Sequence, residues 1–192
     1  MCKITMHRTE AIERLERSRF ESLTPQQRQD ILDSEWFLYE HDLKDAELFP
    51  KEWSEDLRDE VLSHQQREPP ESARYDPLLA YSMSDMFIGV RNEYLVNRLR
   101  ELGIAVDFVT GDVEELFPCP CCSYRSLAER SDYNICPVCY WEDNGARKPE
   151  QFSGPNHMTL GEGQVNFALY GACEQQTATR LSSDRFEWFE KV

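Results

Sequence analysis

The spacing of apolar residues predicts helices over much of the first half of the chain. Thr24 caps a helix in which Pro25 takes the first position, where a missing N–H group is tolerated. Farther along, Trp53, Leu57 and Val61 recur every four residues, so they share one face of another helix. We interpret these apolar side chains as core rather than as a ligand cage.

Further helix starts are marked by proline and asparagine. Pro50 is predicted to open the helix that carries Trp53, and Asp76 with Pro77 is predicted to start a later one. Asn92 is a candidate cap for the next helix. Apolar residues then alternate with smaller or polar ones over residues 104–108, which predicts a short, half-buried strand.

Two Cys-x-x-Cys pairs follow this part of the chain. Cys119 pairs with Cys122, Cys136 pairs with Cys139, and the thirteen residues 123–135 lie between them. Each pair can form a tight knuckle, and four thiolates fill the tetrahedral shell of a structural zinc site. The gap is slightly shorter than the usual span of roughly 15–20 residues but can hold a hairpin. We therefore predict one structural Zn²⁺ on these four cysteines, with a pair of redox motifs as the alternative.

Three further cysteines and one histidine are candidates for other chemistry. We interpret Cys2, Cys121 and Cys173 as reduced bystanders. An alternative site uses three cysteines with His157, or keeps one position open for water as catalytic zinc does. A cysteine nucleophile needs a base and an orienting group, which the sequence does not reveal. We therefore predict no enzyme activity and no catalytic residue, with a zinc- or cysteine-dependent hydrolase as an alternative.

These patterns together predict an α+β fold, in which a mostly helical N-terminal region precedes a small four-cysteine zinc ribbon with flanking helices. Residues 1–68 form an acidic helical region, residues 74–116 a connecting region of helices and a strand, and residues 117–192 the zinc-ribbon domain. Within that last part, Thr159 and Glu162 have the spacing of a capping box and predict a helix after the cysteines.

The formal net charge of the 192 residues is −15. No cluster of Lys and Arg is present to neutralise phosphates, so nucleic-acid binding is not expected despite the ribbon. The sequence contains no run of about 18 apolar residues, so no membrane span is predicted. The N-terminus lacks the apolar core of a signal peptide. We therefore expect a cytoplasmic protein.

Negative charge is concentrated between Asp30 and Glu60, where twelve acidic and three basic residues give −9. An acidic surface suits a basic protein partner and speeds its association by electrostatic steering. A contribution to solubility alone is the alternative. The candidate partner contacts are acidic residues of this segment and of the second knuckle: Asp42, Asp45, Glu47, Glu55, Asp56, Asp59, Glu142 and Asp143.

The run FPCPCCSYRSLAERSDYNICPVCYWEDNG, followed by SGPNHMTL and NFALYGAC, resembles the bacterial cysteine-rich CPCC family over about residues 117–174. The upstream runs RYDPLL and FIGVRNEYL also resemble longer members. The chain departs from the family at GQ, residues 163–164, where members more often have Ala-Arg. We expect Trp141 to pack over the metal knuckle, and Asn156 and Asn166 to bond backbone groups of the ribbon loops.

The resemblance implies a small zinc-binding module and a place among small cytoplasmic bacterial proteins of toxin systems, which include immunity proteins. With the acidic composition, it leads us to expect an immunity protein that binds and neutralises a cognate toxin, one that is basic around its active site. The alternatives are a zinc-ribbon adaptor and a nucleic-acid-associated regulator.

Overall fold

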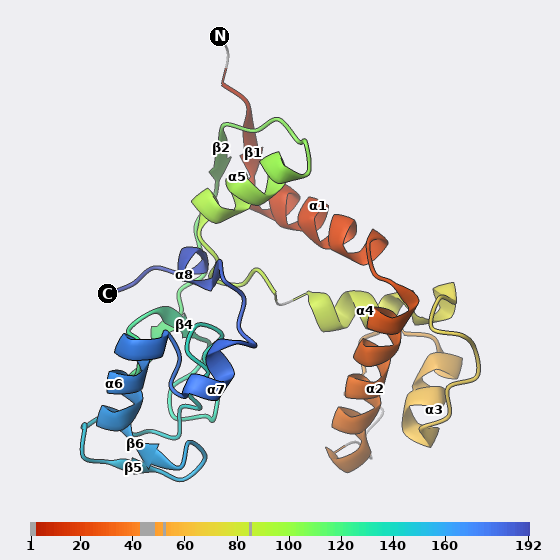
Figure 1. Cartoon of the computed structure of the whole chain (residues 1–192). Coiled ribbons are helices and arrows are strands. Elements are labelled where there is room, and N and C mark those ends of the chain that lie inside the picture. Colours follow the sequence, from red (N-terminus) through yellow and green to blue (C-terminus); the bar gives the residue numbers. More distant parts are fainter. Residues whose placement is uncertain (1–2, 43–48, 52, 85) are drawn as a thin grey trace. The chain divides into compact units, whose positions relative to one another are not determined.

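The chain folds into two compact units of helices and short strands, an α+β architecture (Figure 1). The computed structural model describes residues 3–42, 49–51, 53–84 and 86–192, and for residues 36–42 it describes the backbone alone. One unit, here called the helical unit, is Thr9–Phe87. The other, the cysteine unit, combines Met1–Arg8 with Ile88–Val192. These boundaries differ from those of the three regions predicted from the sequence, 1–68, 74–116 and 117–192. The three-part division stays a prediction.

The helical unit contains four α-helices and one 3₁₀ turn in its described residues. They are α1 (Arg8–Glu21), α2 (Pro25–Asp42), α3 (Glu55–Ser63), η2 (Ala73–Tyr75) and α4 (Asp76–Met83). Helices α3 and α4 both pack against α2 (Figure 1). Among the helices described in either unit, none is both long enough and apolar enough to span a membrane.

Local capping sets where these helices begin. The N–H of Gln27 donates to Thr24 Oγ1 at 3.3 Å and the N–H of Thr24 donates to Gln27 Oε1 at 2.9 Å, which confirms the predicted start of α2. Helix α3 begins at Glu55 and not at Pro50 as predicted. Ser54 decides this start, because its hydroxyl accepts the N–H of Leu57 at 3.2 Å and so satisfies a first-turn donor.

The core of the helical unit gathers apolar side chains from three helices and the segments between them. It comprises Leu32, Phe49, Trp53, Leu57, Val61, Tyr75, Leu78 and Leu79, all buried. Trp53 packs against Phe49 with ring centroids 5.6 Å apart, which confirms that Trp53 is core. Burial of this set is the main driving force for folding of the unit, since apolar area removed from water contributes roughly 25 cal/mol per Å².

One carboxylate is fully buried at the edge of this core. Glu60 Oε2 accepts the hydroxyl of Tyr75 at 2.7 Å and the N–H of Arg67 at 3.2 Å. Its other oxygen, Oε1, lies 2.5 Å from Arg74 Nε as an ion pair whose angle is poor for a hydrogen bond. The Glu60 carboxylate thus links α3 to η2 and to the loop between them.

The cysteine unit is built from short elements. They are β1 (Thr5–His7), α5 (Asn92–Glu101), β2 (Phe108–Thr110), β3 (Phe117–Pro118), β4 (Arg125–Leu127), β5 (Phe152–Ser153), β6 (Met158–Thr159), α6 (Leu160–Tyr170), α7 (Gln175–Ala178) and α8 (Arg185–Trp188). β1 pairs with β2 in parallel, whereas β3 with β4 and β5 with β6 form antiparallel pairs. Strands this short give little stability by themselves.

The strand predicted over residues 104–108 lies farther along the chain, at β2. Met6 of β1 is paired with Val109, and both side chains are buried. Phe108, which the alternation had placed inside, is 48% exposed. The parallel pairing with β1 sets this register, and a shift of one residue turns every side chain to the opposite face.

An ion pair joins Arg8, the first residue of α1, to the segment before the cysteines. The guanidinium of Arg8, which is almost fully buried, donates to both oxygens of Glu114, and the N–H of Gly89 donates to Glu114 Oε2 at 2.9 Å. Partial burial alone would raise the pKa of Glu114, but these hydrogen bonds outweigh it and lower the pKa to about 2.

Replacing this carboxylate is expected to weaken the cysteine unit. Because the Glu114 side chain is 45% exposed, solvent screens the pair, and we expect Glu114→Gln to lower the free energy of unfolding by about 1 kcal/mol. A lowered carboxyl pKa stabilises the fold above the ordinary value of 4.5 and loses that effect as pH falls toward about 2. The difference between variant and parent should therefore be the same at pH 7 and pH 6 in urea titrations. If the difference in unfolding free energy became smaller between pH 7 and pH 6, that would contradict the lowered pKa. The control is Glu115→Gln, which changes the exposed neighbouring residue.

Candidate metal centre

The two Cys-x-x-Cys segments form loops with the same backbone hydrogen bonds. In the first, the N–H of Ser123 donates to Cys119 O at 2.9 Å. In the second, the N–H of Tyr140 donates to Cys136 O at 2.8 Å. The residue after each pair has a positive φ, 66° for Ser123 and 69° for Tyr140. Each chain segment thus turns tightly enough for its two cysteines to face one point.

Each loop is closed by one more bond of the same kind. The N–H of Cys119 donates to Tyr124 O at 2.8 Å, and the N–H of Cys136 donates to Trp141 O at 2.9 Å. The two knuckles therefore repeat each other residue for residue, which is the local geometry that a four-thiolate metal site requires.

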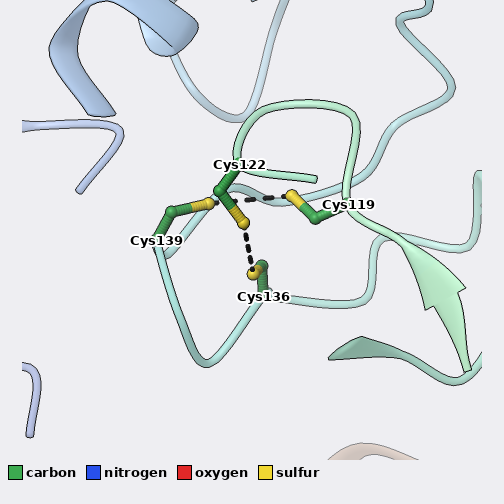
Figure 2. A group of neighbouring side chains, drawn as sticks. All are labelled: Cys119, Cys122, Cys136 and Cys139. Carbon is green, nitrogen blue, oxygen red and sulfur yellow. Dashed lines mark hydrogen bonds between the residues drawn. The ribbon is translucent and has the colours of Figure 1, made fainter. Parts of the chain in front are cut away.

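The four sulfur atoms converge in the interior of the cysteine unit (Figure 2). Cys119 Sγ lies 3.7 Å from Cys139 Sγ, and Cys122 Sγ lies 3.6 Å from Cys136 Sγ. All four lie within 4.8 Å of one another, and each cysteine is at most 2% exposed. Four sulfurs bound to zinc at about 2.3 Å stand roughly 3.8 Å apart in a tetrahedron, and the two measured pairs match that spacing.

Burial and mutual contact shift the pKa values of these four thiols in different directions. Burial raises the pKa of the Cys139 thiol well above its ordinary value, and the contact with Cys122 raises the pKa of Cys119. Burial alone would also raise the pKa of Cys136, but hydrogen bonds from the other three thiols and Ser126 lower it. Four buried thiolates are mutually repulsive unless a cation lies between them, and a divalent ion supplies that charge.

Other candidate ligands lie outside the cluster. Among the described residues, the four cysteines are the group of His, Cys, Asp and Glu side chains close enough to hold an ion, and His157 is not part of it. His157 is exposed on the loop between β5 and β6. Burial raises the pKa of Cys173 to about 12, so this thiol stays protonated at neutral pH. Cys121 is also buried, and Cys2 lies outside the described residues.

Trp141 forms the wall between the second knuckle and α6. Its side chain is fully buried, and a Cβ placed on Gly163 of α6 would lie 2.7 Å from its Cζ3 atom and 3.5 Å from Cys121 Sγ. This confirms that Trp141 packs beside the knuckles. It also gives a reason for glycine at position 163 in this chain, because α6 approaches the indole too closely for a side chain.

Gly163→Ala is therefore expected to destabilise the cysteine unit, although alanine favours helix. The added methyl group forces Trp141 or α6 to move, and overpacking of this kind costs about 1–3 kcal/mol. Thermal unfolding of the metal-loaded chain should show the loss. The control is Gly154→Ala, because nothing lies within 4 Å of a Cβ at Gly154. Equal melting temperatures for both variants would contradict the close contact.

Asparagine side chains hold the loops around the knuckles. Asn156 Oδ1 accepts the N–H of Glu142 at 2.9 Å, and its Nδ2 donates to Glu142 O at 2.8 Å. Asn166 Nδ2 donates to Cys173 O at 2.8 Å. Both amides bond backbone groups as expected from the sequence.

The sequence did not predict the roles of two arginines near the metal centre. Arg185, at the start of α8, is 5% exposed and donates through Nε to Val138 O at 2.9 Å, which fixes the second knuckle from outside. Its Nη2 donates to Gly171 O at 3.1 Å. Arg147 donates to both carboxylate oxygens of Asp143, at 2.6 and 3.0 Å. A single arginine in a loop or short helix carries no sequence signal for such a role.

The predicted partner contacts differ in their exposure. Glu55, Asp56 and Asp59 are exposed on α3, and Glu142 is half-buried beside the second knuckle; the side chains of Asp42, Asp45 and Glu47 lie outside the described residues. Asp143 is fully buried. Burial alone would raise its pKa, but hydrogen bonds from Arg147, Ser131 and Gly145 lower it, so this carboxylate bonds its own chain and we leave it out of the proposed partner surface.

Comparison with known proteins agrees with this geometry. Residues 117–185 match the family model described as Cysteine-rich CPCC. The matched segment begins two residues before Cys119, contains both knuckles and ends at Arg185. No curated protein and no solved structure matches the chain. The family match and the four-cysteine cluster together indicate metal binding by this segment.

Proposed function

We propose that the chain is an inhibitory binding protein, of the immunity type, in which a structural Zn²⁺ holds the CPCC segment folded and an acidic surface receives a basic partner. The observation that carries the structural role is the closed set of four buried cysteines. Four thiolates complete the coordination of zinc and leave no position for a substrate or an activated water. The ion would therefore contribute to folding and not to chemistry.

The proposed partner surface lies on the helical unit. Its 79 residues include twenty acidic and nine basic ones, so it carries −11 of the chain's −15. Glu55, Asp56 and Asp59 stand exposed on α3, and the long 3.8 Å contact of Asp56 with Arg74 leaves that carboxylate largely hydrated. A toxin that acts on nucleic acid or nucleotides is expected to be basic around its active site, and carboxylates can replace the phosphates there. A reducing cytoplasmic location is proposed with this function, in keeping with six described cysteines that form no disulfide.

The test is binding to the protein encoded by the neighbouring reading frame, with the full chain loaded with metal. We expect a stoichiometric complex whose association rate falls about tenfold or more when Glu55, Asp56 and Asp59 are changed together to Gln, Asn and Asn, and falls again with added salt. The control changes Glu129, Glu150 and Glu187 of the cysteine unit to Gln, which removes the same charge. An equal effect of both triple variants, or turnover of a substrate by the chain alone, would contradict the proposal.

A further inference from the structure

Ser126 of β4 stands next to one of the four cysteines. It is 8% exposed, and its Oγ lies 3.1 Å from Cys136 Sγ. The same oxygen lies 3.3 Å from Tyr124 O. Its single hydroxyl hydrogen can be donated to only one of these two acceptors at a time.

The choice between the two acceptors depends on the charge of the sulfur. Tyr124 O already accepts the N–H of Cys119 at 2.8 Å, so it does not need the hydroxyl. A protonated Cys136 can itself donate to Ser126 Oγ, which then turns its hydrogen toward Tyr124 O. A metal-bound Cys136 has no hydrogen and is an acceptor only, and hydrogen bonds to charged acceptors are the stronger ones. Metal binding therefore turns the Ser126 hydroxyl toward sulfur.

We propose that Ser126 is a positioning residue of the metal centre, whose hydroxyl donates to the Cys136 thiolate and makes the four ligands unequal. The inference rests on the proposed metal site. The backbones of the two knuckles repeat each other, but in the described part of the chain Ser126 is the one hydroxyl in contact with a ligand sulfur. The hydrogen bond draws electron density from Cys136 Sγ, fixes its rotamer and makes this sulfur the least reactive of the four toward electrophiles.

Cobalt substitution tests this role in the full chain. Co²⁺ bound by thiolates absorbs through sulfur-to-metal charge transfer, and a hydrogen bond to sulfur raises the energy of that transition. We expect Ser126→Ala to move the charge-transfer band to longer wavelength and to weaken Co²⁺ binding about tenfold in competition with a chelator. Ser126→Thr keeps the hydroxyl and should return both to the parent values. Ser183→Ala, which changes an exposed serine of the same unit outside both knuckles, should change neither.

The outcomes separate this inference from the metal site itself. A parent chain without a tetrahedral cobalt–thiolate spectrum contradicts the site and the proposed function. A normal parent spectrum with an unchanged Ser126→Ala band overturns the role of Ser126 alone. If Ser126→Ala does not fold, the Thr variant decides, because a band at the parent position supports the hydrogen bond and a shifted band contradicts it.

Discussion

Removal of the metal is expected to unfold the segment around the knuckles while the helical unit keeps its structure. Strands β3 to β6 contain two or three residues each, so their pairing alone cannot hold this segment together. Binding of zinc to four cysteines contributes on the order of 10 kcal/mol, and in small metal domains this energy is folding energy. The helical unit has an apolar core of its own that includes none of the four cysteines.

Hydrogen exchange of the full chain with and without chelator measures this directly. Peptides from residues 117–185 should lose their protection, while peptides from α1, α3 and α4 should keep it. Cys136→Ala should give the same pattern without chelator, because three sulfurs leave the ion incompletely held. Cys121→Ser is the matched control, since Cys121 lies between two ligands in the sequence but is not one of the four. Loss of metal in that variant, or protection of both units after chelation, would contradict the assigned ligands.

Loss of the buried carboxylate is expected to be the most damaging single change in the helical unit. Glu60→Ala leaves the Tyr75 hydroxyl without its buried acceptor and the Arg74 guanidinium without its nearest carboxylate. Breaking a buried charge pair from one side costs about 3–5 kcal/mol, because the remaining charge stays desolvated. Arg74 is 24% exposed and can turn partly toward water, so the lower end of that range is expected.

Urea unfolding followed by far-UV circular dichroism gives the measurement, with metal bound so that the cysteine unit remains folded. Asp59→Ala is the control, because Asp59 is exposed on the same helix and its removal should change the free energy of unfolding by less than about 0.5 kcal/mol. A cost below about 1 kcal/mol for Glu60→Ala would show that its network does not hold α3 to η2.

The ligand set could be predicted from the sequence because each knuckle is local. Cys119 and Cys122 are brought together by a turn of five residues, and the same holds for Cys136 and Cys139. Only the meeting of the two knuckles is a tertiary event, and their thirteen-residue separation leaves few other ways to bury four thiols. The capping boxes at Thr24 and Thr159 were predictable for the same reason.

Burial of single charged residues could not be predicted in this way. Asp143 and Glu142 are adjacent and chemically alike, yet Asp143 points inward to Arg147 while Glu142 is half-buried. On α3, Glu60 is buried whereas its neighbour Asp59 is exposed. Whether a carboxylate pairs with an arginine depends on residues far along the chain or on the geometry of a loop. Neither leaves a periodic pattern in the sequence. The start of α3 at Ser54 and the register of β2 were missed for similar reasons.

X-ray absorption at the zinc edge, made on the purified full chain together with its metal content, tests the central claim most directly. The account predicts one zinc per chain with four sulfur neighbours at about 2.3 Å and no nitrogen or oxygen ligand. A chain without bound zinc, or a zinc with three sulfurs and an exchangeable water, would contradict it.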